Sequence, residues 1–146
     1  MSMHLGIRPI AVAACTCILS ILGCESKPYG LAPVSGIVTL DAQPVSGVRV
    51  TFQPSGRDTE NPGPGSSAFT DASGRYEVKT VRGDPGAVPG QHTVRILNPA
   101  PQMASSDDSA APPRKEIIPR HYEDGHLTFD VPPEGTNAAD FVLTSQ

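Results

Sequence analysis

The chain has 146 residues, which is the size of one small domain, with a net charge of −4 and 38% hydrophobic residues. An acidic chain of this kind lacks the basic surface that a nucleic-acid-binding protein needs to neutralise phosphates. Its length excludes a large multidomain enzyme, and no apolar run reaches the roughly 20 residues that span a bilayer.

Residues 1–23 have the pattern of a bacterial lipoprotein signal peptide. A polar start containing Arg8 precedes an apolar run over residues 10–22, which has the size of a signal-peptide core and is too short for a membrane anchor. The run ends in ILGC at residues 21–24, which resembles the lipobox. In that signal the cysteine is acylated and becomes the first residue after cleavage, so the resemblance implies lipidation at Cys24.

Two alternatives exist for this segment. A second lipobox ends at Cys15, but it would leave almost no apolar run before it, and an ordinary secretory signal would make Cys24 incidental. All three cysteines (15, 17 and 24) lie here, so cleavage before Cys24 leaves one thiol in an exported chain, which lipidation explains. Glu25 follows in place of the aspartate that tends to retain lipoproteins at the inner membrane, which favours the outer membrane.

Residues 24–33 are expected to tether the domain, residues 34–146, close to the membrane. Cleavage removes Arg8 and no acidic residue, so the net charge falls from −4 to −5. From Val34 onward, apolar and polar residues alternate with a period of two, which is typical of half-buried antiparallel strands. The pattern predicts seven strands, at residues 34–40, 48–53, 66–70, 75–80, 92–97, 127–131 and 139–143.

The connections between these strands carry turn and loop signals. Asp71 and Gly74 predict a hairpin turn, because aspartate accepts local backbone hydrogen bonds and glycine supplies positive φ. Residues 55–65 form a loop rich in proline and glycine, and residues 98–113 form a low-complexity loop that we expect to be mobile. No stretch of the mature chain has a helical period. Short strands with frequent turns predict an all-β sandwich.

Three segments resemble carboxypeptidase-regulatory-like domains, which have a transthyretin-like (prealbumin-like) Greek-key sandwich. They are VSGIVTLDAQPVSGVRVTFQP (34–54), TDASGRY (70–76) and VPGQHTV (88–94). The first departs from the family at Ala42, where a glycine is common. Residues 118–122, 127–131 and 141–143 resemble the ends of small lipoproteins of planctomycete-type bacteria. The resemblance implies a fold and a mostly non-catalytic accessory, surface or binding module, since fold alone does not define function.

The densest group of potential metal ligands consists of His121, Glu123, Asp124 and His126. Two imidazoles and two carboxylates can hold a divalent ion, but Glu-Asp-Gly is also good turn chemistry. We therefore treat them as weak candidates and predict no metal and no cofactor. The acidic pair at residues 107–108 favours solubility over calcium binding.

No catalytic constellation is recognisable in the sequence. His92 lies on the apolar face of its strand, where a core histidine is expected, and no nucleophile, metalloprotease or phosphate-loop motif accompanies it. Transthyretin-like hydrolases end in Tyr-Arg-Gly-Ser, whereas this chain ends in FVLTSQ (141–146). We therefore predict that the chain is not an enzyme.

The sequence as a whole predicts a lipid-anchored, non-catalytic β-sandwich of the bacterial cell envelope. It would act as a structural or protein-interaction module, with an exposed edge strand available to a protein partner and no nucleic-acid partner. The alternative is a lipoprotein that binds a small ligand, a carbohydrate or a metal through its loops or the segment from His121 to His126.

Overall fold

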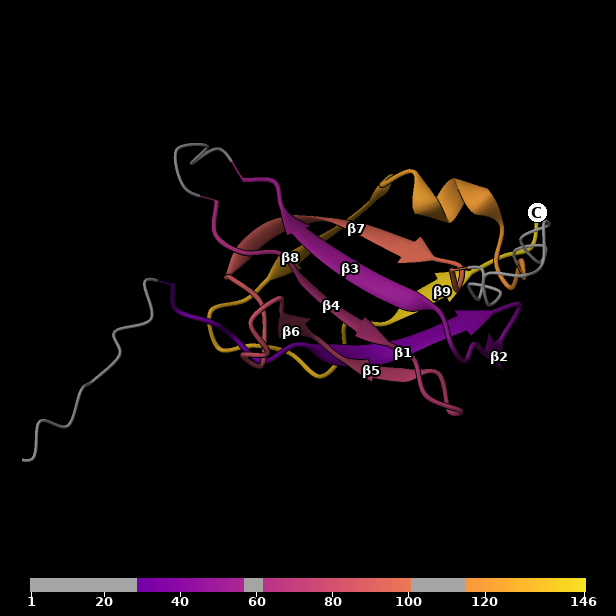
Figure 1. The fold of residues 1–146 in the computed structure, drawn as a ribbon, viewed down its shortest axis with the longest axis horizontal. Coiled ribbons are helices and arrows are strands. Elements are labelled where there is room, and N and C mark those ends of the chain that lie inside the picture. The colour runs from indigo at the N-terminus through magenta and orange to yellow at the C-terminus, as the bar shows by residue number, and fades with distance from the viewer. Residues whose placement is uncertain (1–28, 57–61, 101–114) are drawn as a thin grey trace, which may run out of the picture.

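The computed structural model describes residues 29–56, 62–100 and 115–146, which form two β-sheets packed face to face (Figure 1). The first sheet has the order β2-β1-β5, with β9 also paired to β1, and the second has the order β6-β4-β3-β7-β8. The predicted all-β sandwich is confirmed. The bounds of the first sheet are β1 Ser35–Leu40, β2 Gln43–Pro44, β5 Arg75–Glu77 and β9 Phe141–Leu143. Those of the second are β3 Arg49–Pro54, β4 Ser66–Phe69, β6 Lys79–Thr80, β7 Gly90–Leu97 and β8 Leu127–Val131.

The alternation that predicted the strands places one face of each strand in the core. On the central strand β3, Val50 and Phe52 are buried, whereas Arg49 and Gln53 are exposed. The Phe52 ring lies at the centre of the core, and four rings have their centroids between 5.8 and 6.3 Å from its own. These rings belong to both sheets (Tyr76, His92, Phe129 and Phe141). Burial of apolar side chains between the two sheets is therefore what holds them together.

The predicted strand at residues 75–80 is divided between the two sheets. Its first part is β5, which pairs with β1, and its last part is β6, which pairs with β4. Val78 is fully buried between the two parts. The alternation continues through both parts because each sheet buries its inward face, so the sequence pattern alone could not reveal the crossing.

Asp71 and Gly74 form a turn but not the predicted hairpin. The Asp71 carboxylate accepts hydrogen bonds from the backbone N–H of Ser73 at 2.8 Å and of Arg75 at 3.0 Å. Gly74 has a φ of +73°, as expected for the residue that closes such a turn. The hairpin prediction is wrong because β4 and β5, on either side of the turn, lie in different sheets.

The last strand, β9, runs parallel to the first strand, β1. Phe141 lies opposite Val38 and Leu143 opposite Leu40. The chain reaches this position by crossing close over Gly36, where the Ala139 N–H donates to the Ser35 carbonyl at 3.0 Å. This parallel pair was not predicted, because the local alternation of β9 carries no information about the direction of its partner.

One short helix was not predicted. The 3-10 helix η1, Arg120–Glu123, follows Pro119 and leads into Gly125, which has a φ of +82°. Four residues are too few to display a helical period in the sequence. The helix contacts β7 and leads toward the edge strand β8.

Candidate functional site

The second half of the predicted tether, residues 29–33, is part of the folded domain. Ala32 is buried and pairs with Ala87, through an N–H to carbonyl bond of 2.8 Å in one direction and 2.9 Å in the other. Tyr29 lies near Gly63 and Val88. The segment from Tyr29 to Pro33 is therefore held against the domain, at the end of the sandwich where β6 lies and opposite to the end marked C (Figure 1).

A hollow of about 360 Å³ lies at this end of the molecule. Its described lining residues are mainly apolar, and Arg82 contributes an exposed cation. The lining residues come from the N-terminal segment, from the chain before β4 and from the turn after β6 (Tyr29, Leu31, Pro64, Thr80, Val81, Arg82 and Asp84). We call the part formed by Tyr29, Leu31, Pro64, Val81 and Arg82 the anchor-side surface.

The turn at residues 80–83 presents Val81 and Arg82 at its corner. The Gly83 N–H donates to the Thr80 carbonyl at 2.9 Å, which closes a β-turn. The Thr80 hydroxyl accepts from the N–H groups of Arg82 at 3.3 Å and Asp84 at 3.2 Å. Val81 is 85% exposed at the corner of this well-braced turn. Turn corners favour proline, glycine and small polar residues, so a β-branched apolar side chain here is unusual.

The weak metal-ligand candidates do not converge. His121, Asp124 and His126 are exposed, and the His121 ring lies 4.1 Å from the Tyr122 ring. Glu123 Oε1 accepts hydrogen bonds from the backbone N–H and the side-chain amide of Asn98. Within residues 29–56, 62–100 and 115–146, no three histidine, cysteine, aspartate or glutamate side chains come close enough to hold a metal.

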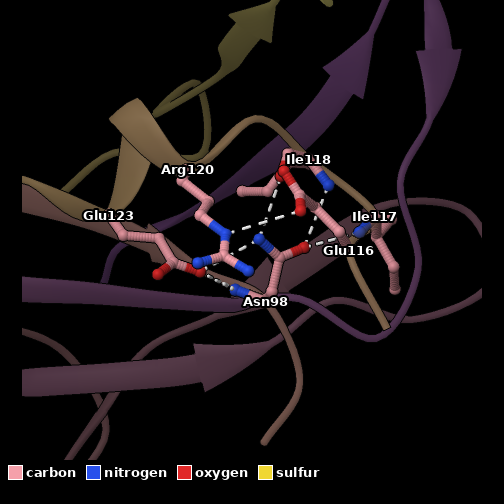
Figure 2. A network of polar contacts seen from close by, with 6 residues as sticks. All are labelled: Asn98, Glu116, Ile117, Ile118, Arg120 and Glu123. Carbon is pink, nitrogen blue, oxygen red and sulfur yellow. Dashed lines mark hydrogen bonds and ion pairs between the residues drawn. The ribbon is translucent and has the colours of Figure 1, made fainter. Parts of the chain in front are cut away.

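Asn98 is instead the centre of a polar network, which we call the Asn98 clasp (Figure 2). Its side-chain oxygen accepts from the N–H groups of Ile117 at 2.6 Å and Ile118 at 2.9 Å. Its side-chain nitrogen donates to the Ile118 carbonyl and to Glu123 Oε1, both at 2.9 Å. The Asn98 backbone N–H also reaches Glu123 Oε1, at 3.0 Å.

The clasp corrects one sequence-based prediction. Asn98 was assigned to the mobile loop at residues 98–113, yet it is only 4% exposed. Its side chain joins the end of β7 to the segment containing Ile117 and Ile118, about twenty residues later in the sequence. No local pattern signalled this role, because the partners of the side chain among the described residues (Ile117, Ile118 and Glu123) are distant in sequence.

His92 is a buried core residue, as its place on the apolar face of its strand predicted. It is 1% exposed, and its Nδ1 donates to the Gly90 carbonyl at 2.9 Å. Its Nε2 has no hydrogen-bond partner among the described residues. Burial lowers the pKa of His92, and the Gly90 hydrogen bond and the charge of Asp130 oppose this shift only in part.

We expect acid to destabilise the domain through His92. Since its pKa is lower in the folded state, the unfolded chain binds more protons once the pH falls below about 6.5. Stability is therefore full above that pH and falls below it, by at most about 1.4 kcal/mol per pH unit. Urea unfolding between pH 5 and 8 measures this slope. His92→Leu should flatten it, whereas His126→Gln, at an exposed histidine, should not; equal slopes in all three proteins would contradict the assignment.

Several predicted residues fall outside the described part of the chain. These are the lipobox residues, including Cys24 and its rival Cys15, together with Glu25 and the acidic pair at 107–108. In the described ranges, no helix has the length and hydrophobicity needed to cross a membrane.

Comparison with solved structures shows a likeness in fold, without a match at the level of sequence families. No protein-family model and no curated protein matches the chain. A solved structure, the dioxygenase domain of a dioxygenase–carbohydrate-binding protein fusion from the cellulolytic bacterium Streptomyces sp. SirexAA-E, is similar at 22% identity over 84% of each chain, with a TM-score of 0.41.

This likeness corrects the prediction that the chain is not an enzyme. The similar structure is a dioxygenase domain, so the exclusion of catalysis is withdrawn. The exclusion rested on the lack of contiguous sequence motifs, whereas a sandwich brings together side chains that are far apart in sequence. At this TM-score the likeness assigns no chemistry and no residue role to the present chain.

Proposed function

We propose that the chain is a lipoprotein of the bacterial cell envelope, anchored by acylation of Cys24. Its β-sandwich would act at the membrane surface as a structural or protein-interaction module, with the outer membrane favoured because Glu25 follows the cysteine. The observation that carries the proposal is the placement of Ala32, which is fixed to Ala87 only eight residues after the proposed acylated cysteine. A domain fixed so close to a lipid-bearing residue would stay at the membrane.

The proposed protein-interaction role is supported by an edge strand of the second sheet. Among the described residues, β8 is the terminal strand of this sheet and pairs only with β7. Thr128 and Asp130 are exposed on it. An edge strand leaves one row of backbone N–H and carbonyl groups unpaired, and such a row can accept a strand from a partner. Binding of a small ligand, a carbohydrate or a metal stays a prediction of the sequence.

The anchor is tested by intact mass and membrane fractionation in a lipoprotein-competent bacterium. We expect the wild-type protein to begin at Cys24, to carry added acyl mass and to sediment with membranes. Cys24→Ser should lose both the acyl mass and the membrane association, because the thiol that receives the lipid is gone.

Cys15→Ser is the matched control, since it removes the cysteine of the rival lipobox and leaves Cys24 in place. It should behave like the wild-type protein. Loss of acylation in Cys15→Ser, or a mature N-terminus elsewhere without lipid, would overturn the proposal.

A further inference from the structure

We infer that the anchor-side surface docks directly onto the phospholipid bilayer and fixes the orientation of the sandwich on the membrane. The inference rests on the proposed anchor at Cys24 and goes beyond it, because an anchor alone would leave the domain free to tumble. It assigns a binding role to Tyr29, Leu31, Val81 and Arg82.

The first argument is the reach of the chain. Five residue steps separate Cys24 from Tyr29, and an extended chain of that length spans at most about 18 Å. Tyr29 itself lines the hollow, and Ala32 behind it is fixed to Ala87. The end of the sandwich that carries the anchor-side surface is therefore the end held nearest to the lipid, whereas the C-terminal end is far from it (Figure 1).

The second argument is the chemistry of the surface. Val81 is one of three large apolar side chains that are strongly exposed among the described residues, and it is the most exposed of them at 85%. Tyr29 and Leu31 add partly buried apolar walls beside it. Tyrosine is enriched at membrane interfaces, where its ring contacts acyl chains and its hydroxyl remains hydrated.

The third argument is the charge and rigidity of the corner. Arg82, exposed next to Val81, places a guanidinium where lipid phosphates would lie, and guanidinium pairs well with phosphate. Among the described lining residues Asp84 is the only acid, and it is partly buried. The Thr80 hydroxyl braces the turn, so docking would cost little conformational entropy.

The absence of tryptophan from the chain allows a direct test. Val81→Trp and, as a matched control, Val142→Trp each place a single tryptophan at an exposed valine, the control being on β9. Each full-length acylated protein is reconstituted into vesicles of phosphatidylethanolamine and phosphatidylglycerol, with and without brominated acyl chains. We expect a blue-shifted emission quenched by bromolipid at position 81, and an unshifted, unquenched emission at position 142.

Adding Arg82→Glu to Val81→Trp should reduce the quenching, whereas Arg75→Glu in the same background should not. Vesicle-bound protein with equal quenching, or none, at both positions would overturn the docking while leaving the anchor intact. Protein that carries no acyl mass and stays off the vesicles would overturn both proposals. Circular dichroism of each variant establishes that it is folded before the measurement.

Discussion

Asn98→Asp is expected to lower the free energy of unfolding by about 4 kcal/mol, because it removes two buried donors and adds a charge beside another carboxylate. The Ile118 carbonyl and Glu123 Oε1 each lose a donor at 2.9 Å. The introduced carboxylate would then lie within contact distance of Glu123. Asn98→Ala should cost about 3 kcal/mol, since it also leaves the N–H groups of Ile117 and Ile118 unpaired but adds no charge.

A second substitution separates the charge repulsion from the loss of hydrogen bonds. In Asn98→Asp, adding Glu123→Gln replaces the facing carboxylate with an amide that can donate to the new side chain. We expect the double variant to recover about half of the lost stability. Asn137→Asp, at an exposed asparagine, is the control and should stay within about 0.5 kcal/mol of the wild type. Urea unfolding measures all four variants, and no recovery in the double variant would contradict the geometry of the clasp.

Gly36→Ala is expected to cost about 3 kcal/mol or more, because overpacking against a backbone cannot be relieved by a change of rotamer. A methyl group at this position would overlap the Ala139 carbonyl, which also accepts a hydrogen bond from the buried Tyr76 hydroxyl. The crossing of the chain toward β9 would have to move, and the pairing of β9 with β1 would weaken. The midpoint of thermal or urea unfolding reports the loss.

Gly30→Ala is the matched control for this prediction. Its added methyl group meets nothing within 4 Å and its backbone is not in the left-handed region, so stability should change by no more than about 0.5 kcal/mol. A Gly36→Ala protein as stable as Gly30→Ala would contradict the close crossing of Ala139 over β1.

The sequence predicted the position of a strand correctly where that strand buries one face and exposes the other. Strands β1, β3, β7 and β8 lie where the period of two predicted them, because burial of alternate residues is a local property. Partner choice is not local. The same alternation runs through β5 and β6 although they belong to different sheets, and β9 does not reveal that its partner is parallel.

The turn between β1 and β2 shows a similar limit of prediction from the sequence. Asp41 and Ala42 both have positive φ, at 48° and 65°, which is the geometry of a two-residue hairpin loop that favours glycine at its second position. Carboxypeptidase-regulatory-like domains, which the sequence resembles, commonly have glycine where this chain has Ala42. The backbone nevertheless takes the conformation that a glycine would take there, because the pairing of the flanking strands imposes it.

The candidate site was predicted only in part. The lipobox is a linear motif of the sequence, and it stays a prediction because its residues lie outside the described part of the chain. The anchor-side surface was not predicted, because it combines Tyr29 and Leu31 with a turn fifty residues later. The feature that could have indicated this surface is Val81, a valine at the corner of a tight turn. The His121–His126 cluster was misleading because proximity in sequence did not bring its side chains together.

The pairing of β9 with β1 has a consequence for when the chain can fold during its synthesis. The first strand of the domain acquires one of its neighbours from residues about a hundred positions later, so the first sheet cannot be completed until residues 141–143 have been synthesised. Until then the edge of β1 that pairs with β9 lacks this partner strand. Completion of the first sheet would therefore come late in synthesis, which is compatible with the export that we propose.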